Sequence, residues 1–183
     1  MPKKTIVSAI DIAVWFAGRA NRAKQKISSQ QLQNLLFLVQ MHHLSNKGQP
    51  LIPSMFVCCD YGFYEPSVQM FINHNFNGCE LVNFNHETEF FLETVWQKYT
   101  KISPQDLQKF ITSLECWKTN FLPDEETIVN PLAIADSFLQ SISAGQKSKS
   151  DRPKIRLSQH GPVEVSPWKP RKVKTNSSKK DNV

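Results

Sequence analysis

Residues 29–47 carry the pattern that most restricts how this chain can fold. Apolar side chains recur there with the three- and four-residue spacing of one helix face. Ser28 stands at the N-cap position, Gln31 follows three residues later as in a capping box, and Gly48 is a typical helix stop with Pro50 shortly after it. The pattern predicts a long helix whose apolar face must be covered by other elements. That face consists of Leu32, Leu35, Leu36, Val39 and His43.

Further segments show helical spacing or helix start signals. Pro66, Pro104 and Pro131 each stand where a first helical turn tolerates proline, and Ser103 and Asn130 precede two of them as caps. We therefore expect further helices over residues 6–23, 66–76, 87–101, 104–117 and 131–139.

A small β element completes the expected fold. Residues 55–59 are short and rich in β-prone side chains, and residues 80–84 follow a turn signal at Asn77-Gly78. We expect these two stretches to pair. The fold class predicted for this part of the chain is mainly α: a compact bundle of about six helices with a small two-stranded β element.

Composition and charge change after Ser143. Residues 1–144 contain 11 Lys and Arg against 13 Asp and Glu, a net charge of −2, whereas residues 145–183 contain 11 against 3, a net charge of +8. The second segment has few large apolar side chains, so it cannot bury enough surface to offset its ordering entropy. We expect a helical domain over residues 1–144 and a basic, largely disordered tail over 145–183, in which residues 155–157 and 163–165 can form a hairpin.

The basic tail has three possible roles. Clustered Lys and Arg side chains release counterions from nucleic acid, and an adjacent aromatic ring can stack on a base. The same cluster can instead contact a protein partner or serve as an address, or it can be a solvated segment that improves solubility. The candidate contact residues are Trp168, Lys169, Arg171, Lys172 and Lys174.

Sequence motifs typical of enzymes are absent. There is no Gly-rich phosphate loop, GxSxG elbow or HExxH helix. The four cysteines lack the CxxC spacing of zinc sites, and they fit reduced thiols in a cytosolic protein. The apolar runs are too short to cross a membrane, and we recognise no signal peptide. We expect a cytoplasmic protein that is not an enzyme and that holds no cofactor or metal.

The segment from Asp60 to Pro66 crowds three aromatic side chains into one turn. Exposed aromatic rings are typical binding anchors because they offer a large contact area at low entropic cost. The alternative is that Tyr61 and Phe63 fold back onto the core. If the turn is an interface, its partner-binding residues are Tyr61, Phe63, Tyr64 and Pro66.

Three blocks of this sequence resemble the Panacea antitoxin domain family. Residues 10–16 resemble the family's opening helix "DVAKYF", and residues 31–51 resemble its block "KLQKLLYYAQ…HL…GKPL". Residues 61–68 resemble its turn "YGPVVPEVY", although Phe63 stands where the family usually has proline. The resemblance is strong over about residues 6–72, weak from there to about 140, and does not include the tail. The family includes the SocA-like antitoxins, and its members are often labelled phage-associated proteins.

This resemblance implies a mainly α-helical domain that neutralises a cognate toxin by direct contact. Some members of the family deliver the toxin to a Clp-type protease as adaptors. The resemblance brings no catalytic residues with it. Its implied function is therefore a protein-binding module of a toxin–antitoxin pair, and the alternative from the residues is a nucleic-acid-associated regulator that acts through the tail.

Overall fold

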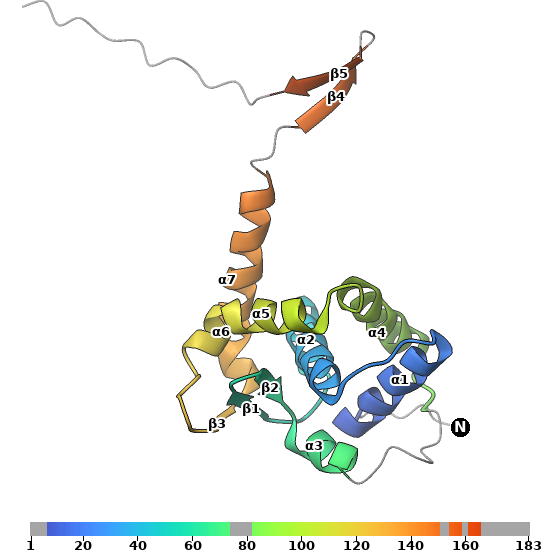
Figure 1. Cartoon of the computed structure of the whole chain (residues 1–183), viewed down its shortest axis with the longest axis vertical. Helices are drawn as coiled ribbons and strands as arrows, with labels where there is room; N and C mark the ends of the chain where they lie inside the picture. Colours follow the sequence, from blue (N-terminus) through green and yellow to red (C-terminus); the bar gives the residue numbers. More distant parts are fainter. Residues whose placement is uncertain (1–6, 74–81, 151–153, 159–160, 166–183) are drawn as a thin grey trace, which may run out of the picture. The chain divides into compact units, whose positions relative to one another are not determined.

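The computed structural model describes residues 7–73, 82–150, 154–158 and 161–165. The chain divides into two units, Met1–Ser143 and Ala144–Val183. The described residues form seven α-helices, a three-stranded antiparallel sheet in the first unit and a two-stranded hairpin in the second (Figure 1). The mainly α prediction is confirmed, with seven helices in place of about six and with three strands in place of two.

Helix α2 (Ser29–Lys47) lies in the middle of the first unit (Figure 1). Ser28 caps it by accepting a hydrogen bond from the backbone N–H of Gln31 at 3.1 Å, and Gly48 ends it with φ +67°. The predicted buried face of this helix was too narrow, because every residue from Gln31 to Met41 is buried, on all sides of the helix. Helices and the sheet surround α2, so its polar side chains are also enclosed.

Helices α1 (Ala9–Arg22) and α4 (His86–Tyr99) lie on the same side of the first unit and are joined by an ion pair. The Arg19 guanidinium donates two hydrogen bonds to Glu93, at 2.8 and 2.9 Å, and lies 5.6 Å above the ring of Trp96. Two parallel bonds of this kind fix orientation as well as distance. The pair therefore sets how α1 and α4 sit against each other.

The sheet has the strand order β2-β1-β3, and both pairings are antiparallel. Its strands are β1 (Phe56–Cys59), β2 (Gly62–Tyr64) and β3 (Thr127–Val129). The predicted pairing of 55–59 with 80–84 was wrong: residues 82–84 form no strand, and residues 80 and 81 lie outside the described part. The second partner of β1 comes from a segment about 70 residues away, which no local pattern identifies.

The remaining helices are α3 (Pro66–Asn73), α5 (Pro104–Ser113), α6 (Glu115–Lys118) and α7 (Pro131–Ser150), of which α7 begins in the first unit and extends past its last residue, Ser143. The helix predicted over 104–117 is divided, because Leu114 is extended with φ −68° and ψ 142°. This break lets the N–H of Glu115 bond Ser141 of α7 at 3.1 Å and lets Trp117 Nε1 donate to the Cys59 carbonyl at 2.9 Å. Tertiary bonds thus replace the continuation of the helix.

In the second unit, β4 (Lys154–Ser158) pairs antiparallel with β5 (Gly161–Val165), so the predicted hairpin is confirmed. Across the described ranges, no helix combines the length and hydropathy needed to cross a bilayer. The tail residues predicted to contact nucleic acid or a partner lie outside the described residues; they are Trp168, Lys169, Arg171, Lys172 and Lys174.

Candidate interaction surface

The aromatic turn between β1 and α3 divides its side chains between the core and the surface. Phe63 is fully buried and stacks on Phe37 with ring centroids 4.1 Å apart, so its predicted contact with a partner was wrong. Tyr61 is 57% exposed, Tyr64 is half-buried and Pro66 is exposed. Strand alternation explains why Phe63 and Tyr64 differ, since neighbouring residues point to opposite faces of a sheet. Three of the four predicted residues remain accessible.

Two glutamine side chains of α2 hold the turn by hydrogen bonds to its backbone. Gln33 Oε1 accepts from the backbone N–H of Glu65 at 2.9 Å, and its Nε2 donates to the carbonyl of the same residue at 3.3 Å. Gln30 Nε2 donates to the Tyr61 carbonyl at 3.0 Å. The buried Glu65 carboxylate in turn accepts from the N–H of Val68 at 2.7 Å and so caps α3. Sequence reasoning missed these residues because their backbone partners lie about 30 positions away.

Gly62 lies in the turn at a position with little room for a side chain. Its φ is +121°, and a Cβ there would lie 3.0 Å from Asn34 Oδ1 and 3.1 Å from Ile111 Cγ2. Asn34 is fully buried and accepts a hydrogen bond from Gln30 Nε2 at 3.3 Å. Glycine therefore allows the turn to approach α2 closely.

The face of the sheet that points away from α2 is partly apolar. Val57 lies directly opposite Tyr64 on one side and Ile128 on the other, so the three side chains share this face. Ile128 is 71% exposed. Met55, just before β1, and Leu132, just after β3, are exposed and line one shallow groove. Val57 itself is buried, at 6% exposure, so the accessible members of this face are its neighbours. We call the accessible set the outer sheet surface: Met55, Tyr64, Ile128 and Leu132, with Tyr61 at the turn.

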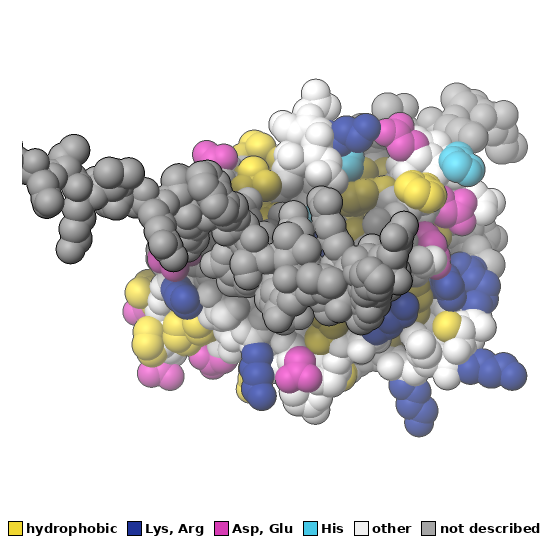
Figure 2. All heavy atoms as spheres, turned by 90° about the horizontal axis from the view of Figure 1, so that it is seen from above, with side chains coloured by type: hydrophobic (Ala, Val, Ile, Leu, Met, Phe, Trp, Pro, Cys, Tyr) yellow, Lys and Arg dark blue, Asp and Glu magenta, His cyan; other side chains and the backbone are white. Residues whose placement is uncertain are grey.

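An acidic groove of about 550 Å³ borders the outer sheet surface at the end that carries the turn. Its carboxylates come from the turn and from the segment before β3, and we call them the acidic rim: Asp60, Asp124, Glu125 and Glu126. None of the four forms an ion pair with a Lys or Arg of the described ranges. At the left edge of Figure 2, acidic and hydrophobic side chains lie side by side where Figure 1 places the segment between α6 and β3.

Tyr64 connects the outer sheet surface to the acidic rim. Its hydroxyl donates a hydrogen bond to Glu126 at 2.8 Å. Desolvation by burial, together with this bond, raises the pKa of Tyr64 to about 12. The phenol is therefore a neutral donor at physiological pH, and it leaves the other oxygen of the Glu126 carboxylate available to a partner.

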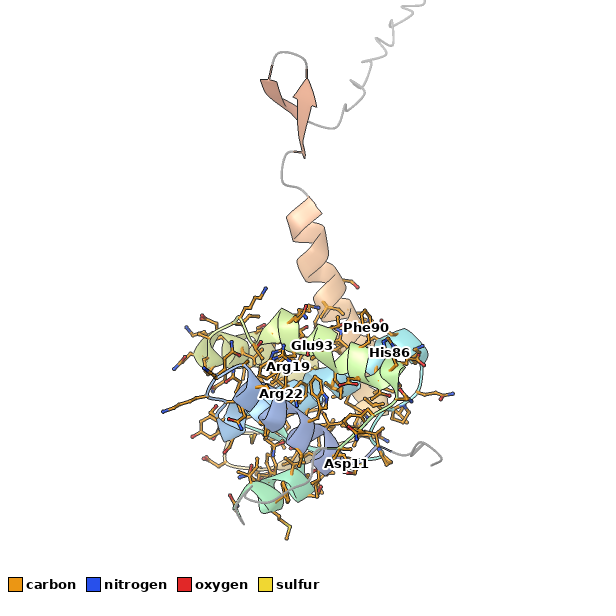
Figure 3. The ribbon with its side chains drawn as sticks, turned by 90° about the vertical axis from the view of Figure 1, so that its right-hand side faces the viewer. Asp11, Arg19, Arg22, His86, Phe90 and Glu93 are labelled. Atoms are coloured by element: carbon orange, nitrogen blue, oxygen red, sulfur yellow. The ribbon has the colours of Figure 1, made fainter. Side chains whose placement is uncertain are left out.

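A second groove, of about 510 Å³, runs between the end of α2 and α4. Phe90 is 69% exposed at its border, Phe91 lies within it, and Lys47 and Glu87 form an exposed ion pair of 2.7 Å across it. Figure 3 shows Phe90 on α4, the helix that also presents Glu93 to α1. This groove lies away from the aromatic turn, and none of the predicted site residues contributes to it.

The two adjacent histidines of α2 diverge, as the helical spacing predicts. His42 Nε2 lies 2.6 Å from the Tyr99 hydroxyl, whereas His43 Nδ1 lies 2.7 Å from the Gln49 carbonyl. Burial, with a smaller contribution from Lys98, lowers the pKa of His42 to about 4. In the part of the chain that the structure describes, no three His, Cys, Asp or Glu residues are grouped to hold a metal ion.

No protein-family model, curated protein or solved structure matches this chain. Residues of the three sequence blocks have structural roles here: Gln33 and Gly62 hold and accommodate the turn, and Gln40 bonds the backbone of Leu51 and Ile52.

Proposed function

We propose that this chain is an antitoxin-like protein-binding module that neutralises a cognate toxin by direct contact through the outer sheet surface. The observation that carries the proposal is the clustering of exposed apolar side chains. Of seven large hydrophobic residues exposed in the described ranges, five lie on this surface or in the segment before β3. Contiguous exposed apolar side chains are typical of interaction sites. The five are Met55, Tyr61, Leu122, Ile128 and Leu132.

The scaffold supports this role because it holds the backbone that carries Tyr61. Gln30 bonds the backbone of Tyr61, and Gln33 bonds that of Glu65, so both ends of β2 are tied to α2. A side chain presented by a rigid backbone loses less entropy on binding. A standard interface buries roughly 800 Å² on each partner, which one face of a domain of this size can supply.

Neutralisation would then follow from occlusion of the toxin surface. Delivery of the bound toxin to a Clp-type protease, which the family resemblance suggests, would use the same contact and add a second one. In both cases the first step is a stable complex, so the complex is what an experiment should measure.

Co-expression with the product of the neighbouring gene tests the proposal. We expect co-purification of the two proteins and rescue of growth if that product is toxic. Replacement of Tyr61 and Ile128 by Asp should abolish both effects, whereas Met70→Asp, at a residue 65% exposed on α3, serves as the matched control. Absence of a complex, or equal binding by all three chains, contradicts the proposal.

A second candidate function rests on the net charge of +8 in residues 145–183. A tail that neutralises about six phosphates would give nucleic-acid binding with a steep salt dependence. Deletion of residues 146–183 should then abolish binding of DNA and RNA at low salt. Unchanged binding after the deletion contradicts this function and leaves the toxin proposal unaffected.

A further inference from the structure

The open side of β3 suggests how a partner engages the outer sheet surface. This inference rests on the proposed function and makes it more specific. We infer that the partner adds an extended, basic segment to the sheet next to β3, with apolar side chains over the outer sheet surface and Lys or Arg side chains against the acidic rim. Such strand addition obtains its affinity from backbone hydrogen bonds and its specificity from side chains.

The two edges of the sheet differ in how they are covered. At β2, side-chain amides of α2 bond the backbone just before and just after the strand. Gln30 donates to the Tyr61 carbonyl, and Gln33 bonds both the N–H and the C=O of Glu65. At β3, no strand lies beyond Thr127–Val129 in the described sheet, and no hydrogen bond from another described element reaches its backbone from that side. An edge strand turns alternate N–H and C=O groups outward, where another chain can pair with them.

Side chains next to this edge match an added strand. Ile128 points to the outer face and is 71% exposed, whereas Val129 points to the core and is buried. A new strand beside β3 would place every second side chain on the outer face, beside Ile128. Apolar or β-branched residues at those positions would cover Ile128.

The charges around β3 determine which end of the added segment should be basic. The register pairs Thr127 with Cys58, so the start of β3 lies at the end of the sheet that carries the Asp60 turn. The four carboxylates of the acidic rim gather at this end, and the far end is bordered by apolar Met55 and Leu132. Exposed charges interact over about 8–10 Å at physiological salt. Basic residues of the partner should therefore lie beside Thr127, and apolar ones beside Val129.

Charge complementarity selects this occupant over an acidic one. Near the acidic rim, an acidic strand would add like charges to carboxylates that have no Lys or Arg counterpart in the described ranges. Tyr64 of β2 donates to one oxygen of Glu126, so this carboxylate reaches across the sheet from the β3 side. Its second oxygen and the exposed carboxylates of Asp124 and Glu125 remain acceptors for a guanidinium or ammonium group. The chemistry expected of the partner is thus a short segment with Lys or Arg at one end and alternating Val, Ile or Thr at the other.

Synthetic peptides test this inference on the full chain without reference to any toxin. The first is a ten-residue peptide with Lys at alternate positions of one half and Val or Thr in the other half. The second has Glu in place of Lys. The third keeps the first sequence but carries N-methyl groups on alternate residues, which removes donors needed for strand pairing. Binding is followed by the NMR amide signals of Thr127–Val129 and by their hydrogen exchange.

We expect the first peptide to shift these signals and slow the exchange, and the other two to bind at least tenfold more weakly. The triple variant Asp124→Asn, Glu125→Gln, Glu126→Gln should also bind the first peptide at least tenfold more weakly. Asn tolerates the left-handed backbone at position 124, where φ is +63°, so this variant should fold. The matched control makes the same charge change elsewhere, with Glu89→Gln, Asp106→Asn and Asp136→Asn, and should retain binding.

Several results would overturn the inference. These are absence of shifts at β3 with millimolar first peptide, equal binding of the N-methylated peptide, and equal binding by the triple variant. The outcome is separable from that of the proposed function. If a toxin binds the triple variant with full affinity, the inference that its binding segment is basic is refuted, but the proposed toxin complex is not. If no toxin binds the unaltered chain, the proposed function is refuted, but binding of the first peptide at β3 is not.

Discussion

Gln40 holds the segment between α2 and β1 through three hydrogen bonds. Its Oε1 accepts from the backbone N–H of Leu51 at 3.1 Å and from that of Ile52 at 2.9 Å, and its Nε2 donates to the Ile52 carbonyl at 2.8 Å. Gln40 and Ile52 are both fully buried. The Gln40 amide therefore satisfies the backbone N–H and C=O groups of this segment, as a neighbouring strand would in a sheet.

Gln40→Leu keeps the volume close to the original but removes all three bonds. The N–H and C=O of Ile52 would then be buried without partners, and each such group costs about 1–3 kcal/mol. The N–H of Leu51 is only half-buried, so water can satisfy it in part. We expect the free energy of unfolding to fall by about 2–5 kcal/mol, a large share of the roughly 5–15 kcal/mol typical of a domain.

Urea unfolding followed by circular dichroism measures this loss. The midpoint should fall while the slope m stays unchanged, since the surface exposed on unfolding is the same. Hydrogen exchange should quicken at Ile52 in particular. Gln105→Leu, on the exposed side of α5, is the matched control and should stay within about 0.5 kcal/mol of the unaltered chain. A loss below about 1 kcal/mol for Gln40→Leu would refute the assignment of these three bonds.

Three further predictions concern stability. The pKa of His42 is lowered in the folded chain to about 4 from its ordinary 6.5, so between these pH values the unfolded chain binds more protons than the folded one. The free energy of unfolding should therefore be unaffected by His42 above pH 6.5 and should fall by about 3 kcal/mol as the pH drops through 4. Urea unfolding of His42→Gln should show a smaller fall over the same pH range. Gly62→Ala should lower the free energy of unfolding by about 1–3 kcal/mol because of its positive φ and the contact with Asn34. Glu93→Gln should cost about 1 kcal/mol, an effect that shrinks in high salt, because its bidentate bond to Arg19 is only partly buried.

The helices were largely predictable from the sequence because their signals are local. Ser28, Ser103 and Asn130 bond backbone N–H groups two or three residues away, as capping residues do, and Gly48 ends α2. All of these interactions lie within one helical turn. Periodicity and capping therefore placed α1, α2 and α4 to within three residues and placed the start of α5, but they missed the break at Leu114.

The sheet and the polar residues inside the core were not predictable in this way. β3 pairs with β1 across about 70 residues of chain, and its own sequence, Thr-Ile-Val, is too short to identify it as the partner. Gln33 and Gln40 read as the polar side of an amphipathic helix, yet both are buried because backbone segments from 12 to 32 residues away require their amides. Side-chain burial here depends on where distant backbone groups need partners.

The candidate surface was predicted in part. Aromatic crowding at the turn pointed to Tyr61 and Tyr64, which are accessible, but it could not separate them from Phe63, because strand register decides which ring enters the core. The acidic rim joins residues 60 and 124–126, which only the three-stranded pairing brings together.

Gln33 connects the core to the outer sheet surface, and this connection can be tested separately from stability. Gln33→Leu removes both bonds to the Glu65 backbone and frees the end of β2 that carries Tyr64, although Gln33 is only 1% exposed and cannot contact a partner. If the proposed toxin complex forms, we expect its affinity to fall at least tenfold at a temperature where the variant is still folded. Gln40→Leu is the comparison, since it should cost a similar free energy of unfolding without loosening the turn. Equal affinities of the two folded variants would show that Gln33 stabilises the fold without positioning the surface.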